Sequence, residues 1–271
     1  MADYRFPGEW MKDGMILQQN VTSETITKLE SFEMSEDDVL IAAYPKTGIT
    51  WTQELVWLLN NNGDTKEALS QPVYHRTNYL EFNSDYVHSG LEMKQIEAGK
   101  VKVIVVIRNP KDTLVSLYHF YRMALPLGLF EKSWDDFFEL YKVKHLIYGD
   151  YFQWYSTWLQ YKDKPNVKLV KYEDMHHGMS DVINDLSLFL GKSLSQDVAA
   201  NVMNHLTFDS MSGNDMVNYK RSPFFDFKFS SFIRKGIIGD WKNYFSQIQS
   251  ELIDKSYRNT IEALGVSLEF I

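Results

Sequence analysis

The chain has 271 residues, a formal net charge of −8 at pH 7, seven tryptophans and no cysteine. This length suits one large domain or two small ones, and a hydrophobic content of 44% is enough for a sizeable core. The negative charge argues against general nucleic-acid binding, which needs a basic face. Without cysteine, the chain cannot use disulfides, thiolate nucleophiles or cysteine-ligated zinc.

No targeting or membrane-spanning segment is predicted. Residues Met1 to Phe6 lack an apolar core of signal-peptide length. No apolar run along the chain approaches transmembrane length. We therefore expect a cytoplasmic protein that does not contact a membrane.

Three apolar segments predict buried parallel strands, because such strands are near-continuous runs of apolar and β-branched residues. They are Val39–Ala43, Val101–Ile107 and Val167–Val170. A helical pattern follows each one: the first covers about residues 50–60, the second begins near residue 110, and the third ends at Gly191, a helix C-cap position. Alternating strands and helices indicate a three-layer α/β fold with a central parallel sheet, in a single domain over residues 1–271.

Ligands of such folds bind at the carboxyl ends of the strands. Those ends carry Lys46, Arg108 and Tyr172. The segment Tyr44–Trp51, Tyr-Pro-Lys-Thr-Gly-Ile-Thr-Trp, joins the first strand to a helix, and a turn of this kind presents backbone N–H groups and a lysine to a phosphate. It lacks the spacing of a Walker A loop. Lys46 could instead be an ordinary surface lysine in a turn. Its position between a buried strand and a helix favours the phosphate site.

Two further cationic segments strengthen this hypothesis. Arg108 at the end of the second strand can form a bidentate pair with a phosphate, although a structural salt bridge with Asp112 would also explain it. The run Arg234–Trp241 has two cations before a glycine that permits close approach of the backbone. It ends a stretch over residues 214–239 that has no clear period and reads as a long loop returning to the site, as functional lids do.

The chain resembles the cytosolic sulfotransferases, because four of its segments look like the family's signature segments and occur in the same order. The similarity extends from about Phe6 to the C-terminus. Their spacing is also nearly that of the family, apart from one gap. The four segments are Tyr44–Trp51, Arg108–Asp112 with Ser116, Tyr172-Glu173-Asp174, and Arg234–Trp241.

The resemblance implies a P-loop nucleoside-triphosphate-hydrolase-like fold that binds 3′-phosphoadenosine 5′-phosphosulfate (PAPS), the sulfate donor, without a metal. It also implies a transfer of the sulfuryl group to a hydroxyl or amine of a small acceptor. Lys46 is the implied catalytic residue, which stabilises charge on the bridging oxygen. The implied binding residues are Lys46, Thr47, Gly48, Ile49, Thr50 and Trp51 for the 5′-phosphosulfate; Arg108, Ser116, Arg234, Lys235 and Gly236 for the 3′-phosphate; and Tyr172, Leu206, Thr207, Phe208, Asp209, Ser210 and Met211 for adenine.

The chain departs from the family before the second strand. Family members carry there a strand ending in Lys-Ser/Thr-His, whose histidine is the general base, and we do not find this segment. His88 is the histidine nearest the gap, and a solvated loop histidine is the alternative to a role as base. The second hypothesis is therefore a catalytically impaired or inactive protein that arises as a splice or gene-model variant. It would bind PAPS or its product, 3′-phosphoadenosine 5′-phosphate (PAP). A small-molecule kinase with an unusual phosphate loop is a third.

The acceptor is predicted only by class, as a phenol, alcohol, steroid or amine. Aromatic residues on the acceptor side are expected to form the pocket wall: Tyr74, Tyr79, Phe82, Phe120 and Phe138. The family's dimer motif is matched at its ends by Lys242 and Glu251, with Ser246-Gln247 where Thr-Val is usual. A homodimer through this segment is therefore a further expectation.

Overall fold

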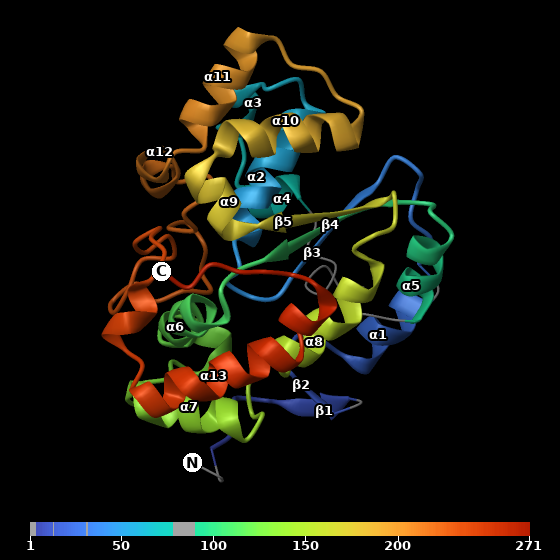
Figure 1. Ribbon diagram of the computed structural model, residues 1–271. Helices are drawn as coiled ribbons and strands as arrows, with labels where there is room; N and C mark the ends of the chain where they lie inside the picture. Colours follow the sequence, from blue (N-terminus) through green and yellow to red (C-terminus); the bar gives the residue numbers. More distant parts are fainter. Residues whose placement is uncertain (1–3, 13, 31, 78–89) are drawn as a thin grey trace.

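A three-stranded parallel sheet forms the centre of the protein. The structure is a computed structural model and describes residues 4–12, 14–30, 32–77 and 90–271. Within these residues the sheet has the order β3 (Val39–Ala43), β4 (Lys102–Ile107) and β5 (Val167–Lys171). Both neighbours run parallel to β4, with Leu40 of β3 opposite Val103. The predicted parallel strands are therefore confirmed (Figure 1).

Helices cover both faces of this sheet (Figure 1). On one side lie α6 (Pro110–Tyr121), α7 (Trp134–Lys142), α8 (Tyr151–Trp158) and α13 (Gln247–Asn259), and on the other α2 (Ile49–Asn60), α9 (Tyr172–His177), α10 (Met179–Leu190) and α11 (Gln196–His205). The side chains of β4 alternate between two apolar clusters. Val103, Val105 and Ile107 pack in the first cluster, and Ile104 and Val106 in the second. A strand buried on both faces has a layer of helices on each side, so the three-layer fold is confirmed.

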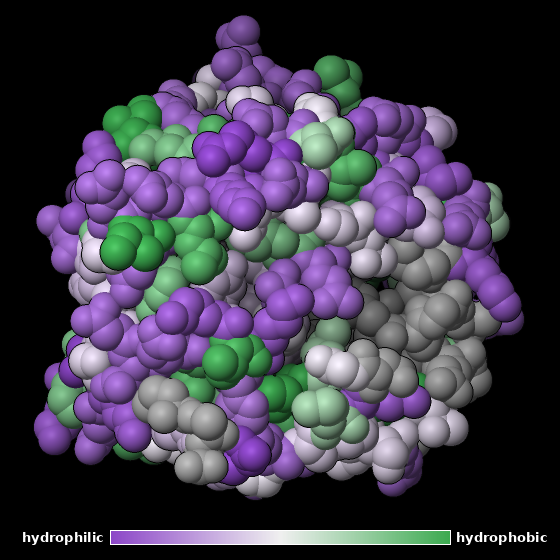
Figure 2. All heavy atoms as spheres, turned by 60° about the horizontal axis from the view of Figure 1, so that its bottom comes forward, coloured by the Kyte–Doolittle hydropathy of each residue, from purple (hydrophilic) through white to green (hydrophobic). Residues whose placement is uncertain are grey.

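The remaining elements surround these layers. They are the antiparallel pair β1 (Trp10–Lys12) and β2 (Met15–Leu17), the helices α1 (Ser23–Glu30), α3 (Thr65–Ala68), α4 (Val73–Arg76), α5 (Gly90–Glu97) and α12 (Phe208–Gly213), and the short 3₁₀ helices η1 (Leu125–Leu127), η2 (Leu159–Tyr161), η3 (Asp240–Asn243) and η4 (Glu262–Leu264). None of the helices in the described ranges has the length and apolar character to cross a membrane. On the face shown in Figure 2, apolar side chains lie in separate groups between polar ones.

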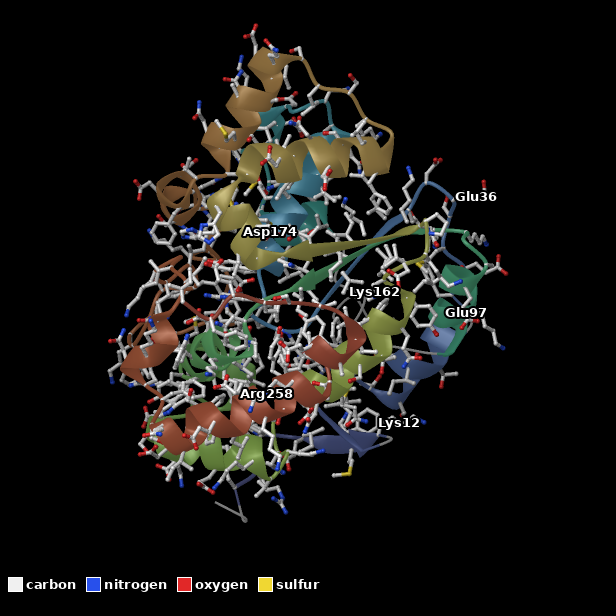
Figure 3. The ribbon with its side chains drawn as sticks, in the orientation of Figure 1. Lys12, Glu36, Glu97, Lys162, Asp174 and Arg258 are labelled. Carbon is white, nitrogen blue, oxygen red and sulfur yellow. The ribbon has the colours of Figure 1, made fainter. Side chains whose placement is uncertain are left out.

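β3 and β4 lead through short turns into α2 and α6, as the sequence predicts, whereas β5 continues into α9, which was not predicted, before the predicted helix α10 begins. A short turn joins β3 to α2, and Gly191 ends α10 in the left-handed conformation with φ 70°. Asn109 caps α6, because its side chain accepts hydrogen bonds from the N–H groups of Lys111 and Asp112. The carboxyl ends of the three strands thus lie at one edge of the sheet. Figure 3 shows Glu36, Glu97 and Lys162 extending from the opposite end, near the amino ends of the strands.

A long loop returns across the carboxyl ends of the strands. Residues 214–239 contain no helix and no ladder strand, as predicted. One isolated bridge joins Phe225 of this loop to Ala124. The Phe232 ring lies 3.7 Å from the Lys46 ammonium, and the carbonyl of Ile237 accepts a hydrogen bond from Arg108. The loop therefore packs directly on the turns that the sequence assigned to phosphate binding.

Candidate functional site

The turn between β3 and α2 has the backbone of an anion-binding turn. Lys46 and Gly48 have positive φ angles of 71° and 110°. A Cβ at Gly48 would lie 3.0 Å from the Tyr172 ring and 3.3 Å from Met175, so a glycine is needed for space as well as conformation. Gly48 is the N-cap of α2, and no side chain of the described residues caps the start of this helix. Its first N–H groups, together with the helix dipole, therefore suit a bound anion.

The Lys46 ammonium lies among aromatic rings and other cations. It is 3.7 Å from the centre of the Phe232 ring and 5.1 Å from that of Phe120. Burial, and then the positive charges of Arg108 and Arg234, lower the pKa of Lys46 to about 7. Among the described residues, no carboxylate forms an ion pair with Lys46. An anion bound here would relieve the repulsion between these cations.

Arg108 is buried at the end of β4 with part of its hydrogen-bonding capacity unused. Its side chain donates to the carbonyls of Lys46 at 3.3 Å and Ile237 at 3.2 Å, and its guanidinium lies 4.0 Å from the centre of the Tyr172 ring. Its Nε is buried and has no partner in the described part of the chain. The backbone carbonyl of Arg108 accepts from the hydroxyl of Tyr151, which fixes the end of the strand.

Asp112, the acid that could have paired with Arg108, has other partners. Its carboxylate accepts the backbone N–H groups of Gly239 at 2.7 Å and Trp241 at 2.9 Å. These bonds attach the end of the long loop to α6. The structure therefore assigns Asp112 to positioning the loop and leaves Arg108 without an ion pair among the described residues.

The run of Arg234, Lys235 and Gly236 lies against α12. Asp240 binds both cations, with Arg234 Nη2 at 2.5 Å and Lys235 Nζ at 2.7 Å. Burial raises the pKa of Asp240, but hydrogen bonds from Lys235 and Arg234 outweigh burial and lower this pKa to about 2. Nε of Arg234 is buried without a partner among the described residues. A Cβ at Gly236 would lie 2.2 Å from the Phe208 ring, so this glycine allows the two segments to touch.

Aromatic side chains from three segments meet beside these cations. The Trp51 indole N–H donates to the carbonyl of Leu206 at 2.9 Å, and the Trp51 ring meets the Tyr172 ring edge-on at 5.6 Å. Phe208 in the first turn of α12 is 38% exposed, so its ring is accessible to a ligand. Thr207 caps α12 by accepting from the N–H of Ser210. A flat apolar group fits beside such rings.

The structure brings most of the predicted site residues together, and a few contribute differently. Thr47 is fully buried, and its hydroxyl donates to the carbonyl of Tyr44 at 2.7 Å. Ser116 is partly buried in the second turn of α6, and Asp209 is exposed in the first turn of α12. Phe232 and Asp240 also contribute to the site and are not among the residues predicted from the sequence. Asp240 has a sequence signal, because it follows the cationic run that it neutralises, whereas nothing in the pattern marks Phe232.

The residues predicted for the acceptor side fall into three groups. Phe120 lies next to Lys46, as described above. Phe138 is only 2% exposed and packs with Trp134 and Phe245 in the core, and Tyr74 stacks on Tyr219. The other predicted residues, Tyr79, Phe82 and His88, lie outside the described residues.

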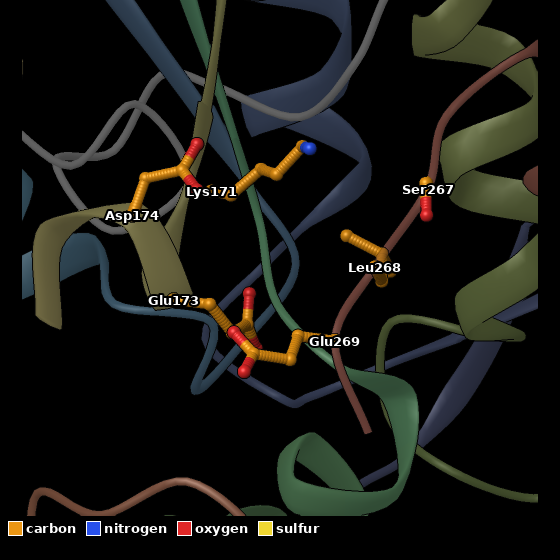
Figure 4. Close-up of a pocket in the computed structure, with 6 residues that line it drawn as sticks. All are labelled: Lys171, Glu173, Asp174, Ser267, Leu268 and Glu269. Atoms are coloured by element: carbon orange, nitrogen blue, oxygen red, sulfur yellow. The ribbon is translucent and has the colours of Figure 1, made fainter. Parts of the chain in front are cut away.

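A pocket of about 330 Å³ lies between the start of α9 and the C-terminal segment (Figure 4). Its lining consists of Lys171, Glu173, Asp174, Ser267, Leu268 and Glu269. Three carboxylates and one ammonium make it unsuitable for a nucleotide with several phosphates. Glu173 accepts the backbone N–H of Asn109 at 2.8 Å and so holds the residue after Arg108. In the described part of the chain, no group of three or more His, Asp and Glu side chains could hold a metal ion.

Together the fold and these contacts define an α/β protein with a site for a phosphorylated nucleotide at the carboxyl edge of its sheet. Comparison with known proteins gives the family. A sequence model of the sulfotransferase domain matches residues 36–265. Sulfotransferase 1A1 of Canis lupus familiaris is 34% identical over 267 residues, which cover 90% of each chain, and Sulfotransferase 1C2 of Homo sapiens is 31% identical over 280 residues, which cover 95% of this chain and 93% of the relative.

Solved structures agree with this assignment. Mouse sulfotransferase SULT7A1 complexed with PAP has a TM-score of 0.75 and 26% identity, over 94% of this chain and 95% of that one. Retinol dehydratase in complex with androsterone and inactive cofactor PAP has a TM-score of 0.82 over 96% of this chain and 91% of that one, and at 21% identity it supports the fold alone. The chain belongs to the sulfotransferase family. It is a sulfotransferase, an enzyme that moves a sulfuryl group from PAPS to a small acceptor.

Proposed function

We propose that this protein binds PAPS through two neighbouring cationic clusters, one for each phosphate-bearing end. The 5′-phosphosulfate would bind at the turn and helix start over residues 46–51, and the 3′-phosphate at Arg108, Ser116 and Arg234–Gly236. Adenine would lie by Trp51, Tyr172 and the segment Leu206–Met211. The observation that carries the proposal is the convergence of Lys46, Arg108 and Arg234, where Nε of both arginines is buried without a partner among the described residues. Charged donors of this kind fit a phosphate.

Lys46 is the proposed catalytic residue. When bound, PAPS supplies an activated sulfuryl group on a phosphate leaving group. Lys46 would neutralise the negative charge that builds on the bridging oxygen, and the N–H groups at the start of α2 would stabilise the same charge. The Thr47 hydroxyl already donates to Tyr44 and would hold the turn in shape. Catalysis would thus depend on positioning and on fixed charges.

The acceptor is proposed to be a small hydroxyl or amine compound that binds beside Phe120. Phe120 supports this placement because its ring lies 5.1 Å from the Lys46 ammonium and 5.8 Å from the Phe225 ring. Sulfate transfer to a panel of phenols, steroids and amines would identify the acceptor.

Two alternatives are proposed for the general base, the group that removes the acceptor's proton. Either His88 serves as this base, or the chain has none. The six described histidines have other contacts: His119 with Tyr244, His145 with Glu9, His176 with the carbonyl of Gly236, His177 with Glu269, His205 with Glu54, and His75 with the Tyr74 ring. None of these contacts is with Lys46. Replacement of His88 by Gln would lower the transfer rate about 10²–10⁴-fold if this histidine removes the acceptor proton. An unchanged rate would exclude it.

Two measurements test the proposed function as a whole. Isothermal titration calorimetry should give tight binding of PAP and much weaker binding of ATP, because ATP has no 3′-phosphate for Arg108 and Arg234. Transfer of labelled sulfate from PAPS should then identify an active enzyme. Tight PAP binding without transfer to any acceptor would favour the inactive binding protein, and tighter binding of ATP than of PAP would overturn the proposed site.

Three expectations accompany this proposal. The chain would form one domain over residues 1–271, act in the cytoplasm, and form a homodimer through the segment from Lys242 to Glu251. Support for the dimer comes from Ile248 in the first turn of α13, which is 79% exposed. Light scattering of the wild type and of Ile248→Glu would test it, because a charge in an apolar contact should give a monomer.

A further inference from the structure

Glu54 of α2 is a fully buried carboxylate held by two side chains from distant parts of the chain. Its side chain has no solvent exposure. Oε2 lies 2.6 Å from Nη2 of Arg76, the last residue of α4, and Oε1 lies 2.7 Å from Nε2 of His205, the last residue of α11. The side chains of Arg76 and His205 are 4% and 7% exposed. A buried carboxylate is stable only with such partners, so the three side chains form one unit.

This unit lies directly beside the segment proposed to bind adenine. His205 ends α11, and the next residue, Leu206, begins that segment. The carbonyl of Leu206 also accepts the indole N–H of Trp51 at 2.9 Å. Trp51 and Glu54 are three residues apart on α2 and therefore share a face of that helix. Two hydrogen bonds from one face of α2 thus hold the start of the adenine segment.

We propose that Glu54 is a positioning residue that sets the adenine slot through His205 and thereby determines the enzyme's selectivity for adenine over other bases. This inference rests on the proposed nucleotide site. Glu54 itself is buried and would not touch the nucleotide. Its bond to His205, at 2.7 Å, fixes the end of α11, and Arg76 holds the other oxygen of the same carboxylate at 2.6 Å.

The Arg76 side of the unit ties the same carboxylate to α4. Nε of Arg76 donates to the carbonyl of Gln71 at 2.9 Å, and its guanidinium lies 4.6 Å from the centre of the Trp57 ring on α2. The arginine is therefore fixed at three points. A carboxylate held this firmly gives His205 a single position, which a solvated pair at the surface would not do.

The experiment compares variants of His205 in binding PAP and guanosine 3′,5′-bisphosphate by calorimetry. His205→Leu removes the bond to Glu54. His205→Asn carries an amide too short to reach it, and His205→Gln restores an N–H donor near the position of Nε2. His145→Leu is the matched control, because it breaks another histidine–glutamate pair, His145 with Glu9 at 3.1 Å, in the N-terminal part of the protein.

We expect PAP to bind about tenfold more weakly to His205→Leu and His205→Asn, because a hydrogen bond to a charged group is lost. The preference for PAP over the guanine nucleotide should fall by about the same factor. His205→Gln and His145→Leu should keep the wild-type preference. The KM for the acceptor should stay within about twofold of wild type in all four variants, since the acceptor is proposed to bind beside Phe120 and not at this segment.

A double-mutant cycle with Trp51→Phe sharpens the test. If His205 and Trp51 hold the same segment, their losses in PAP affinity should be less than additive. An unchanged base preference in both His205→Leu and His205→Asn would overturn the inference, even if their thermal stability falls, because a merely structural role lowers stability alone. Should His205→Leu fail to fold, His205→Asn decides. A wild-type protein that does not bind PAP would instead refute the proposed function.

Discussion

Replacement of Arg108 by Gln tests the division of the nucleotide site into two phosphate clusters. The guanidinium of Arg108 is buried and donates to the carbonyls of Lys46 and Ile237, and its Nε has no partner among the residues that the structure describes. A charge-assisted hydrogen bond to a phosphate contributes about 1.5–3 kcal/mol. Loss of about 2–3 kcal/mol corresponds to PAP binding that is about 30- to 160-fold weaker. Adenosine 5′-phosphate, which has no 3′-phosphate, should bind the variant within about twofold of wild type.

Calorimetry with both nucleotides on wild type, Arg108→Gln and Arg108→Lys gives the measurement. Arg108→Lys should give an intermediate loss, because one ammonium cannot replace a fork of five donors. Circular dichroism and thermal unfolding would check that the variants are folded, since the bonds to the Lys46 and Ile237 carbonyls are also lost. Equal losses for PAP and adenosine 5′-phosphate, or no loss for either, would refute the assignment of Arg108 to the 3′-phosphate.

Three further predictions follow from the geometry and charge of the site. The pKa of Lys46 is lowered to about 7 in the folded protein, so between pH 7 and 10.5 the unfolded chain binds more protons than the folded one. The free energy of unfolding should therefore rise by up to about 1.4 kcal/mol per pH unit over this range. Urea unfolding should show this rise in wild type and a smaller one in Lys46→Met. Gly236→Ala places a Cβ at φ 61° against Phe208, so PAP affinity should fall, and Phe208→Ala should restore part of it, which calorimetry can check. Burial, and then the positive charges of Arg234 and Arg122, lower the pKa of His119 to about 4. The free energy of unfolding of wild type should therefore fall as the pH falls from 6.5 to 4. The urea midpoint of His119→Gln should change less over that range.

The regular elements that carry the site could be predicted from local pattern. The β-branched run that became β4 is buried on both faces, and the predicted ends at Lys46, Arg108 and Tyr172 lie at one edge of the sheet. Gly48 could be assigned from the sequence because a tight turn between a strand and a helix favours a residue that adopts a positive φ without strain. Such features depend on residues close together in the chain.

The partners of the charged residues could not be predicted in the same way. Asp112 is four residues from Arg108, yet it accepts from the distant loop at Gly239 and Trp241. Spacing along the chain gives the residues that can meet, but burial and competing donors decide which of them do. The long loop likewise had no period, so its placement of Phe232 on Lys46 became known only from the folded protein.

The sequence by itself determined the order of the sheet strands, the turn over residues 44–51, the cationic segments and, through their order and spacing, the family. Local conformational preference and hydrophobic periodicity suffice for these features. Only the tertiary structure decided that Lys46 lies among aromatic rings with a lowered pKa, and that Glu54 and His205, which are 151 residues apart, form a buried pair. Contacts of this kind depend on how the layers pack, because desolvation and pairing of charges arise only when distant segments exclude water together.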